Sequence, residues 1–477
     1  MLRTPEQYLE SLRDSRCVYY RGERVADVTT HPELSIGARH CAIDYRLALD
    51  PAHQELSTYT ENREVLNRYF KIPTSSDDLL RRRELIELGT RAGRGVVQLI
   101  KEIGTDFLFA HTIVARQMEE RLKTPYLEHL QVYHRLVARA DFALAVAQTD
   151  VKGDRSLGPS EQEHPDYYVR VVDRQTNGIV VRGAKAHTTN AVFANELIVL
   201  PTRNLSEADR DYALAFAVPA NAKGVKFIVS PFSGEGHSTL HHPVSSRHRM
   251  FESLTIFDDV FVPWERVFLC GEWQFAGPLA LGFVQFHRFT AVSYKLPLLD
   301  LLIGCAMLAA EANGIEKAGH VREKLSRLIA YRETVRALTV AAAHECRMMA
   351  PGVAVPNPVV TNIAKQYFAE HYHAMVQKVQ DIAGGLLVTG PSEEDVVSNE
   401  TSSDIAKYLG GRKGFGALNR LRVFNLIRDF MASDFGGYHE LLAIHAEGSL
   451  EAQKLTILRE FEAGACRAFA AECAGLK

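Results

Sequence analysis

The stretch Tyr167–Thr202, YYVRVVDRQTNGIVVRGAKAHTTNAVFANELIVLPT, decides the fold class because it interrupts a chain that is otherwise patterned for helices. Apolar and polar residues alternate along it and β-branched residues are enriched, which is typical of half-buried strands. Asn177-Gly178 lies between two such runs and predicts a β-hairpin, since both central residues of a type I′ turn take positive φ. Two further runs, DYALAFAVPANAKGVKFIVSP and SLTIFDDVFVPWERVFL, indicate more strands.

Helical patterns flank this β region on both sides. Before it, Asp77–Gly104 places apolar residues at helical spacing behind an acidic N-terminal end. After it, long apolar patterns recur, and the one that begins at Asn357 ends in the pair Gly384-Gly385, as a C-cap should. We therefore predict a mainly helical domain over 1–145, a β domain over 146–272, and a helical bundle over 273–477 whose apolar surface also serves oligomerisation.

Composition limits the function classes. The 477 residues carry a net charge of −3, so neither nucleic acid nor an anionic membrane is indicated as a partner. The N-terminus is too polar for a secretory signal, and no apolar run reaches the roughly 20 residues of a membrane span. The seven cysteines form no CxxC pair. They predict reduced thiols in a cytoplasmic protein and no cysteine-bound metal.

A loop between the helical and β regions has the composition of a ligand-binding loop. Thr149–Gln162, TDVKGDRSLGPSEQ, sets Lys152 and Arg155 among Gly, Pro, Asp and Ser. Such a loop can wrap a phosphate or a flat ring with its backbone N–H groups and two cations. A solvated connection between two domains is the alternative interpretation.

Two further segments are candidates for the same ligand. Arg182–Glu196 interrupts a strand pattern with small residues, so that a planar ring can approach the backbone while Thr188 or Thr189 bonds a heteroatom. A β-bulge with an ST-turn explains this segment equally well. His373–Asp395 ends a helix in two glycines and then offers Thr389. No GxGxxG or Walker A motif is present, so no dinucleotide-binding motif or P-loop is supported.

The histidine-dense stretch Gly236–His248, GHSTLHHPVSSRH, matches no metalloenzyme spacing. It lies in a pattern of Ser and Pro that predicts a loop. We predict no metal site in it.

Taken together, the segments resemble the 4-hydroxyphenylacetate 3-hydroxylase family, which includes 4-hydroxybutyryl-CoA dehydratase. The resemblance rests on TDVKGDRSLGPSEQ, GIVVRGAKAHTTNAVFANELIVLPT, SLTIFDDVFVPWERVFL and DIAGGLLVTGPSEED. It implies an α+β fold of the acyl-CoA dehydrogenase type, with an N-terminal helical domain, a middle β-barrel and a C-terminal helical bundle, assembled as a homotetramer. The hydroxylases of the family use FAD that a separate flavin reductase has reduced, and the dehydratase combines FAD with a [4Fe–4S] cluster.

The resemblance also implies that this chain holds no such cluster. The dehydratase binds its cluster through two cysteines four residues apart, a histidine and a third cysteine. Aligned here, the paired cysteines fall at Gln98 and Glu102, the histidine at His287, and the last cysteine at Tyr294. One imidazole without thiolates cannot hold a cubane cluster.

Positions that act on the substrate differ from both branches as well. The dehydratase's tyrosine falls at Ala291, and its C-terminal carboxylate base falls near Leu442, or at Glu440 after a small shift. The phenol-gripping arginine, tyrosine and histidine of the hydroxylases fall at Ile103, Phe107 and Val146. With Tyr294 these form the predicted substrate pocket, which is therefore largely apolar.

By the same resemblance, His287 is the general acid or base, and Lys295 and Glu252 are further catalytic candidates. An imidazole suits proton transfer because it titrates near working pH, although a structural, packed histidine is the alternative. The residues implied for FAD binding are Thr149, Lys152, Arg155, His187, Thr188, Thr189, Gly384, Gly385 and Thr389.

The predicted function is that of a two-component monooxygenase, which uses reduced FAD and O₂ to hydroxylate or oxidise a small organic, aromatic-type substrate. A cluster-free relative of the dehydratase that acts on an acyl-CoA with FAD stays open, because Glu252 and Lys295 match that branch. A flavin-binding protein without turnover also stays open, because the phenol-gripping residues are missing.

Overall fold

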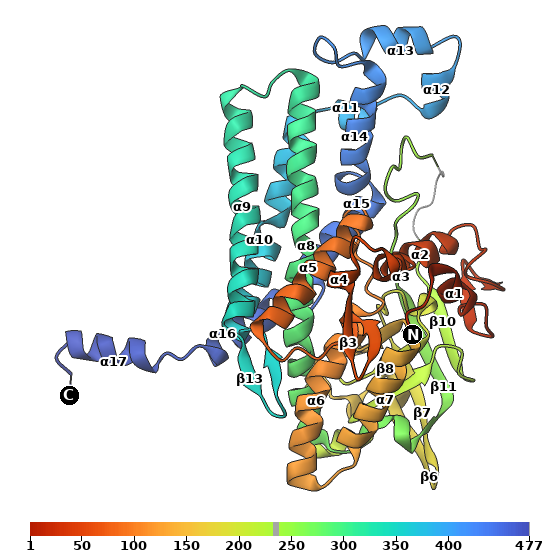
Figure 1. Ribbon diagram of the computed structural model, residues 1–477, viewed down its shortest axis with the longest axis vertical. Coiled ribbons are helices and arrows are strands. Elements are labelled where there is room, and N and C mark those ends of the chain that lie inside the picture. Colours follow the sequence, from red (N-terminus) through yellow and green to blue (C-terminus); the bar gives the residue numbers. More distant parts are fainter. Residues whose placement is uncertain (232–237, 477) are drawn as a thin grey trace.

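The computed structural model describes residues 1–231 and 238–476 as a mixed fold of helices and sheets, which confirms the α+β class. Strands occupy the lower right of Figure 1, and the long helices α8 (Ala276–Asn313), α9 (Gly319–His344) and α10 (Pro358–Ala383) stand to their left and above them. This arrangement brings the first and last parts of the chain against the strand-rich middle.

The N-terminal part is helical after an irregular start. Ser75 caps the helix α5 (Ser76–Ala92), because its hydroxyl accepts a hydrogen bond from the backbone N–H of Asp78. The helical pattern that runs to Gly104 is interrupted after Ala92, where Gly95 takes a φ of +95°. The elements are α1 (Pro5–Glu10), β1 (Cys17–Tyr20), β2 (Glu23–Val25), α2 (Leu34–Cys41), α3 (Ile43–Leu49), α4 (Gln54–Ser57), β3 (Thr58–Glu61), β4 (Glu64–Asn67), α5 (Ser76–Ala92), α6 (Glu102–Leu122) and α7 (Tyr126–Ala140).

The middle strands form two main sheets. The strands are β5 (Leu144–Ala147), β6 (Arg170–Gln175), β7 (Gly178–Lys185), β8 (Glu196–Val199), β9 (Leu214–Pro219), β10 (Val225–Val229), β11 (Ser253–Pro263) and β12 (Val267–Cys270). One sheet has the order β2-β1-β10-β11-β7-β6 and the other β12-β9-β8-β5. The strand pairs recorded for the described residues leave both sheets open, so the predicted barrel is not confirmed. Strand β1, near the N-terminus, pairs in parallel with β10. Local sequence patterns cannot predict a pairing between segments so far apart.

The predicted hairpin is confirmed, but the predicted turn geometry is wrong. Gln175 pairs with Gly178, so the turn residues are Thr176 and Asn177, and neither Asn177 nor Gly178 has a positive φ. A close approach explains the glycine instead. A Cβ on Gly178 would lie 2.3 Å from the carbonyl oxygen of Val262 on the neighbouring strand β11.

The C-terminal part is a bundle of helices. Asn357 caps α10 by accepting from the backbone N–H groups of Val359 and Val360, and Gly384 ends it with a φ of +76°. The predicted glycine C-cap is therefore confirmed. The remaining elements are β13 (Arg347–Met349), β14 (Val353–Val355), α11 (Leu386–Thr389), α12 (Glu393–Val397), α13 (Ser402–Tyr408), α14 (Ala417–Met431), α15 (Asp434–His445), α16 (Leu450–Glu460) and α17 (Gly464–Cys473).

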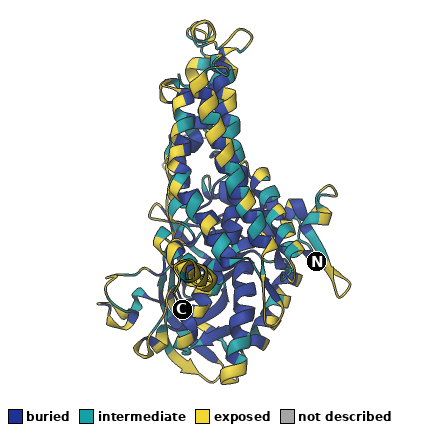
Figure 2. Cartoon of the chain, turned by 90° about the vertical axis from the view of Figure 1, so that its left-hand side faces the viewer, coloured by how far each residue is buried: buried dark blue, intermediate teal, exposed yellow. Residues whose placement is uncertain are grey.

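Helix α8 is the central element of the core. Counted from Trp273, it is long and apolar enough to cross a membrane by length and composition, with a mean hydropathy of 1.6 over its best 18 residues. However, 67% of that window is buried inside the protein, as expected of a core helix. Figure 2 shows buried residues concentrated in the body of the protein and more exposed residues towards the upper end of the view.

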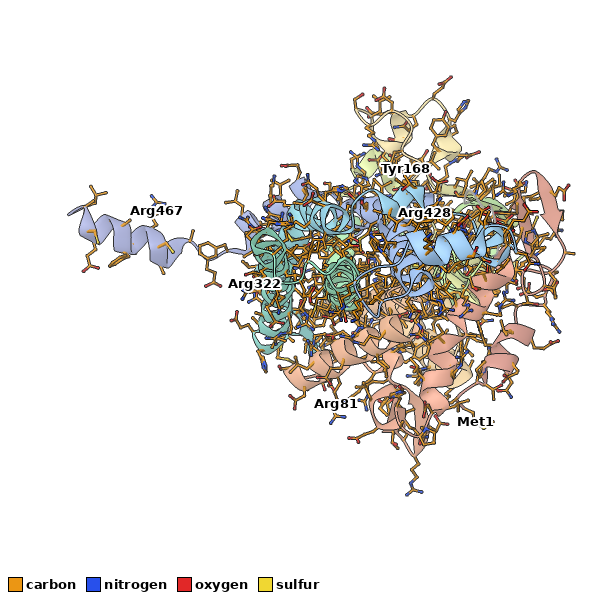
Figure 3. All side chains as sticks on the ribbon, turned by 90° about the horizontal axis from the view of Figure 1, so that it is seen from above. Met1, Arg81, Tyr168, Arg322, Arg428 and Arg467 are labelled. Carbon is orange, nitrogen blue, oxygen red and sulfur yellow. The ribbon has the colours of Figure 1, made fainter. Side chains whose placement is uncertain are left out.

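The last helix, α17, does not pack into the body of the protein. No residue of α17 is buried, and the helix projects away from the body in Figure 1. Figure 3 shows Arg467 on this helix, well apart from the other labelled side chains.

Candidate functional site

His287 is held in place by a carboxylate from a neighbouring helix. Its ring lies on α8, stacks on Phe283, and places Nδ1 3.2 Å from Oδ2 of Asp106 on α6. Asp106 is fully buried and also accepts hydrogen bonds from Arg82 at 2.7 Å and from Thr290 at 2.9 Å. A ring that donates its Nδ1–H to a carboxylate keeps the lone pair on Nε2. The contact with Asp106 therefore leaves Nε2 of His287 able to accept a proton, and its role in catalysis stays a prediction.

A second buried cluster joins α8, α10 and the segment after α15. The Lys295 ammonium lies 2.9 Å from the Glu447 carboxylate and the Lys365 ammonium 3.4 Å from it, while the Tyr294 hydroxyl donates to the other carboxylate oxygen. Burial would raise the pKa of Glu447, but Lys295 and Lys365 outweigh it and hold that pKa at about 2. Burial and the neighbouring Lys295 lower the pKa of Lys365 to about 7.

A third group surrounds Glu252, where the β region meets α15. The Thr189 hydroxyl donates to both oxygens of Glu252, at 2.9 and 3.0 Å, and the Tyr438 hydroxyl donates at 2.7 Å. Burial raises the pKa of Glu252, although both hydrogen bonds oppose the shift. Thr188 is engaged elsewhere, because its hydroxyl donates to the carbonyl oxygen of Ser253 at 2.7 Å. The structure therefore brings the two candidates Thr189 and Glu252 into contact, whereas Thr188 bonds to the strand behind them. Their roles in flavin binding and catalysis stay predictions.

The loop that contains Lys152 and Arg155 is folded on itself by Gln162. The Gln162 side chain accepts from the backbone N–H of Asp154 at 3.0 Å and donates to its carbonyl oxygen at 2.8 Å. Arg155 is exposed, and Lys152 has a φ of +76°. The loop begins at Thr149, whose carbonyl oxygen accepts from the backbone N–H of Ala186 at 2.8 Å. This bond ties the loop to the end of β7, close in sequence to Thr188 and Thr189.

The other residues predicted to contact the flavin are exposed to solvent in this chain. His187 is exposed with a φ of +54°. Gly384, Gly385 and Thr389 are also exposed, and the Thr389 hydroxyl donates to the carbonyl oxygen of Gly385 at 3.1 Å. Figure 1 shows α11, which follows these glycines, near the end of the long helices that is remote from the strands. Within one chain, this segment lies apart from the Thr189–Glu252 group.

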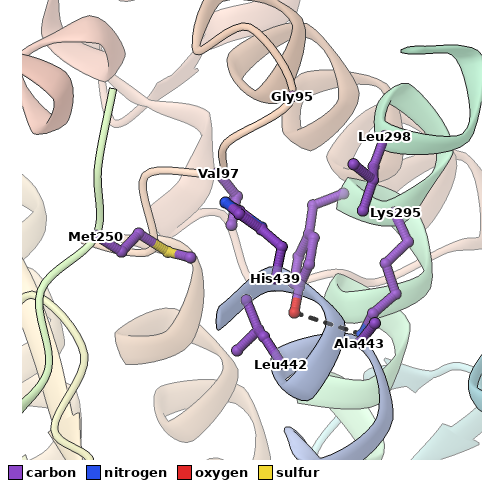
Figure 4. Close-up of a pocket in the computed structure, with 9 residues that line it drawn as sticks. Gly95, Val97, Met250, Lys295, Leu298, His439, Leu442 and Ala443 are labelled. Atoms are coloured by element: carbon purple, nitrogen blue, oxygen red, sulfur yellow. Dashed lines mark hydrogen bonds between the residues drawn. The ribbon is translucent and has the colours of Figure 1, made fainter. Parts of the chain in front are cut away.

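A narrow pocket lies between α8, α15 and the loop after α5 (Figure 4). Tyr294, Lys295 and His439 supply its polar groups. Its remaining lining residues are apolar or glycine, and they are Gly95, Val97, Met250, Leu298, Leu442 and Ala443. Tyr294 thus lines this pocket, and its role as a substrate contact stays a prediction.

The three positions that correspond to the phenol grip have a different environment. Phe107 is fully buried and packs on the ring of Phe268, with centroids 6.2 Å apart. Val146 is buried in β5, and Ile103 packs against the same core. These side chains contribute to the apolar core behind the His287 helix, and none of them lines the narrow pocket. Their role as substrate contacts stays a prediction.

The donor set at the positions of the cluster ligands does not fit an iron–sulfur cluster. The Gln98 amide donates to the carbonyl oxygen of Gly89 at 3.2 Å, and the Glu102 carboxylate accepts from the backbone N–H of Lys101 at 3.1 Å. Tyr294 donates to Glu447. An amide, a carboxylate and a phenol replace the thiolates that such a cluster requires, and each is bonded to the protein itself.

Histidines in the described part of the stretch Gly236–His248 contact other side chains of the protein. Gly236 and His237 lie outside the described residues. Beyond them, His242 lies 3.4 Å from Asp429, and Nδ1 of His248 lies 3.2 Å from Nδ1 of His40. Within 1–231 and 238–476 there is no group of three or more His, Cys, Asp and Glu side chains that could hold a metal.

Sequence reasoning missed the residues that α15 and its flanks contribute. The buried carboxylate of this region is Glu447, which reaches the cluster from a turn with a φ of +59°. Glu440 instead pairs with His373 at 2.8 Å near the surface, and Leu442 is an apolar pocket residue. Tyr438 and His439 were also missed, because nothing in the sequence around them, apart from their being neighbours, marks them as site residues.

Comparisons with known proteins agree with this geometry. The profile described as 4-hydroxyphenylacetate 3-hydroxylase N terminal matches residues 4–269, and its C-terminal counterpart matches residues 276–475. The 4-hydroxybutyryl-CoA dehydratase/vinylacetyl-CoA-Delta-isomerase of Clostridium aminobutyricum is 32% identical, with 100% of both chains covered. The 4-hydroxyphenylacetate 3-monooxygenase oxygenase component of Thermus thermophilus is 32% identical over 92% of this chain and 91% of its own.

A solved structure extends the likeness to three dimensions. It is the oxygenase component HpaB of 4-hydroxyphenylacetate 3-monooxygenase complexed with FAD, which has a TM-score of 0.91 and 30% identity over 99% of each chain. Both halves of the sequence and the whole fold therefore agree, and the chain belongs to the 4-hydroxyphenylacetate 3-hydroxylase family.

Proposed function

We propose that this protein is the FAD-dependent oxygenase of a two-component monooxygenase. It takes reduced FAD from a separate flavin reductase and uses O₂ to hydroxylate or oxidise a small, aromatic-type organic substrate. The observation that carries the proposal is the His287–Asp106 pair in a region whose donor set lacks thiolates. Relatives named as oxygenase components and the FAD complex of HpaB support the same activity.

When bound, FAD supplies the electrons that activate O₂. The chain's own residues position the reaction and move protons. Asp106 orients the imidazole of His287, whose Nε2 gives a proton to, or takes one from, the reacting oxygen. The Thr189 hydroxyl and the half-buried Glu252 carboxyl offer hydrogen bonds to the flavin ring. Burial of these groups excludes water, which strengthens every polar contact in the site.

The remaining flavin contacts are part of the proposal. Lys152 and Arg155 hold the phosphates, from the loop that is tied to the end of β7. The Gly384–Thr389 segment sits towards the remote end of the long helices (Figure 1), so it reaches a flavin held by another copy of the chain. This placement, with the projecting helix α17, supports a homotetramer.

Two further proposals concern the domain organisation and the cellular compartment. We place the domain boundaries at 145/146 and 272/273 and assign the arrangement to the acyl-CoA dehydrogenase type, supported by the order of helices, strands and helices. Strand β5 crosses the first boundary and joins the helical part to the sheet. The protein is assigned to the cytoplasm, which is supported by seven free cysteines.

A second candidate function is an acyl-CoA transformation with FAD and without a cluster. The Glu252 carboxylate favours it, because burial raises its pKa and makes it better suited to removing a proton beside a thioester carbonyl. The match to the dehydratase over 100% of both chains points the same way.

The test separates the two activities. The protein is reconstituted with FAD, reduced without oxygen, and mixed with isotopically labelled O₂ and a panel of phenols. Label in the product supports the oxygenase. Absence of label, together with bleaching of the oxidised flavin by an acyl-CoA, would replace it with the second candidate. Spectra that respond to neither class of compound would leave only flavin binding.

A further inference from the structure

A second hollow, larger than the narrow pocket, is a groove of about 250 Å³ between the first part of α8, α6, α16 and the hairpin of β13 and β14. In Figure 1, α16 and β13 lie at the lower left, close to α6. The groove shares no lining residue with the narrow pocket. Since one water molecule takes roughly 30 Å³ of liquid volume, the groove has room for about eight groups of that size. It can therefore hold a small organic molecule.

Much of the groove wall is apolar. Helix α6 contributes Ile113 and Val114, and helix α8 contributes Leu281 and Phe286. Leu281 is 40% exposed, so part of this apolar surface faces solvent. Concave apolar surface that stays open to solvent is typical of ligand-binding grooves. The walls are therefore suited to the hydrocarbon part of a ligand.

One charged residue of the groove, Arg288, is buried without a carboxylate partner. Its side chain lines the groove, and the residue is 2% exposed. Its Nε donates to the backbone carbonyl oxygen of Glu447 at 3.0 Å and its Nη1 to the side-chain oxygen of Asn362 at 2.6 Å, and both acceptors are neutral. Within the described residues, Nη2 makes no hydrogen bond and the guanidinium forms no ion pair with a carboxylate. A buried arginine is normally paired, so this one lacks a counter-anion.

The Glu447 side chain does not supply that anion. Its carboxylate is held by the ammonium groups of Lys295 at 2.9 Å and Lys365 at 3.4 Å. Burial lowers the pKa of Arg288 to about 10, while the Glu447 charge opposes this shift and the Arg459 charge adds to it. The guanidinium is therefore protonated at neutral pH, although burial destabilises its charge. An anion in the groove would relieve this destabilisation.

The rim of the groove carries an excess of positive charge as well. Arg347 lies 3.2 Å and Arg459 3.0 Å from carboxylate oxygens of Glu460, and all three residues line the groove. Two guanidinium groups thus share one carboxylate. Both arginines are exposed, so their charges attract an anion to the groove but contribute less than the buried Arg288.

We propose that this groove binds an amphipathic carboxylate, whose hydrocarbon part packs between α6 and α8 and whose carboxylate is held by Arg288. A guanidinium presents its N–H groups in a rigid fork that fits a carboxylate. Arg288 is already fixed through Nε and Nη1, so little conformational freedom is lost when Nη2 binds the ligand. The site is separate from the oxygenase site, because none of its lining residues is among the predicted catalytic or flavin-binding residues.

The experiment titrates octanoate into the full-length protein loaded with oxidised FAD, by isothermal titration calorimetry. The alcohol 1-octanol and the amine octylamine provide the same chain without a carboxylate. No reductant is present, so nothing turns over. We expect octanoate to bind at least about tenfold more tightly than 1-octanol, because a buried cation favours the anion. Octylamine should bind more weakly than either, because its charge is repelled by Arg288.

Gly282→Leu tests the groove walls. A Cβ on Gly282 would lie 3.6 Å from the Cβ of Ala110, an ordinary contact, so that a leucine fits there and its longer side chain fills part of the groove. Octanoate affinity should fall by roughly tenfold or more. Gly304→Leu on the same helix is the matched control, since nothing lies within 4 Å of its added Cβ. It should leave octanoate binding unchanged.

The charged positions should act in opposite directions. Arg288→Gln should remove most of the preference for octanoate over 1-octanol. Glu460→Gln should tighten octanoate binding by about two- to fivefold, because it leaves Arg347 and Arg459 to the ligand. Glu451→Gln is the matched control on α16, with a side chain that is 76% exposed. If Arg288→Gln does not fold, Gly282→Leu and Glu460→Gln still test the site.

Equal affinity of the wild type for octanoate and 1-octanol, or no binding of either, would overturn the proposal without any variant. Octanoate binding that Gly282→Leu and Glu460→Gln both leave unchanged would place the ligand elsewhere and would overturn it as well. The measurement involves no oxygen chemistry. The groove can therefore fail as a carboxylate site while the oxygenase activity stands, and the reverse also holds.

Discussion

The Lys295 ammonium lies 2.9 Å from the Glu447 carboxylate, and this contact ties the turn after α15 to the central helix α8. Both side chains are about 1% exposed. The pair therefore joins the C-terminal part of the chain to the pocket through charge in a place where water cannot compete. Two glutamates of the site, Glu447 and Glu252, experience opposite environments, because Glu447 faces two ammonium groups whereas Glu252 faces two hydroxyls.

Glu447→Gln should destabilise the protein at neutral pH. The folded pKa of Glu447 is about 2, below the ordinary 4.5, so its charge stabilises the fold above pH 4.5 and this contribution is lost as the pH falls towards 2. The shift corresponds to roughly 3 kcal/mol. Urea unfolding should show a loss of about that size at pH 7 that shrinks in acid. A difference between wild type and variant that does not change with pH would contradict this account.

Glu252→Gln should show the opposite dependence on pH. Burial raises the pKa of Glu252, so above pH 4.5 the folded protein keeps a proton that the unfolded chain has released. Stability contributed by Glu252 therefore falls as the pH rises towards the folded pKa. The amide of Gln cannot ionise, so the variant should gain stability relative to wild type with rising pH. Urea titrations of both Gln variants in one set of buffers provide the comparison, and parallel trends would be evidence against the two environments described here.

His287→Ala should separate catalysis from cofactor binding. Its Nδ1 contact with Asp106 leaves Nε2 for the reacting oxygen, and loss of a general acid or base costs roughly 10²-fold or more in rate. We expect product formation to fall by that factor while FAD affinity, measured by flavin fluorescence, is kept. His320→Ala, at an exposed position, is the matched control. An unchanged rate and coupling would assign His287 a packing role.

Local sequence patterns were enough to predict the classes of element. Alternation and β-branched residues located strands β6 and β7, and the glycine pair at Gly384 located the end of α10, because these signals act within a few residues. Parallel pairing of β1 with β10 joins segments about 200 residues apart, and no local pattern encodes it. The same limit explains why an interrupted helix near Gly95 was not foreseen, since its glycines depend on packing against other segments.

The same distinction between local signals and tertiary contacts separates the site residues that were predicted from those that were missed. Thr189, Glu252, His287 and Lys295 were reached through resemblance to the family. Tyr438, His439 and Glu447 were missed, because their importance depends on how α15 folds back onto α8 and on a backbone turn of positive φ at Glu447. No sequence pattern assigned a role to Asp106, whereas in three dimensions its carboxylate contacts and orients His287.

Gly178→Ala tests the corrected explanation of the β6–β7 hairpin. Gly178 has no positive φ, so an Ala is not strained by its backbone angles, but the new Cβ would lie 2.3 Å from the carbonyl oxygen of Val262. Forcing the strands apart should lower the free energy of unfolding by about 1–3 kcal/mol. Gly304→Ala in α8 is the matched control, because nothing lies within 4 Å of its added Cβ, and better helix propensity should stabilise it by up to about 1 kcal/mol. Thermal and urea unfolding of both variants measure the difference. Equal stability of Gly178→Ala and wild type would mean that the approach of β11 does not require a glycine at this position.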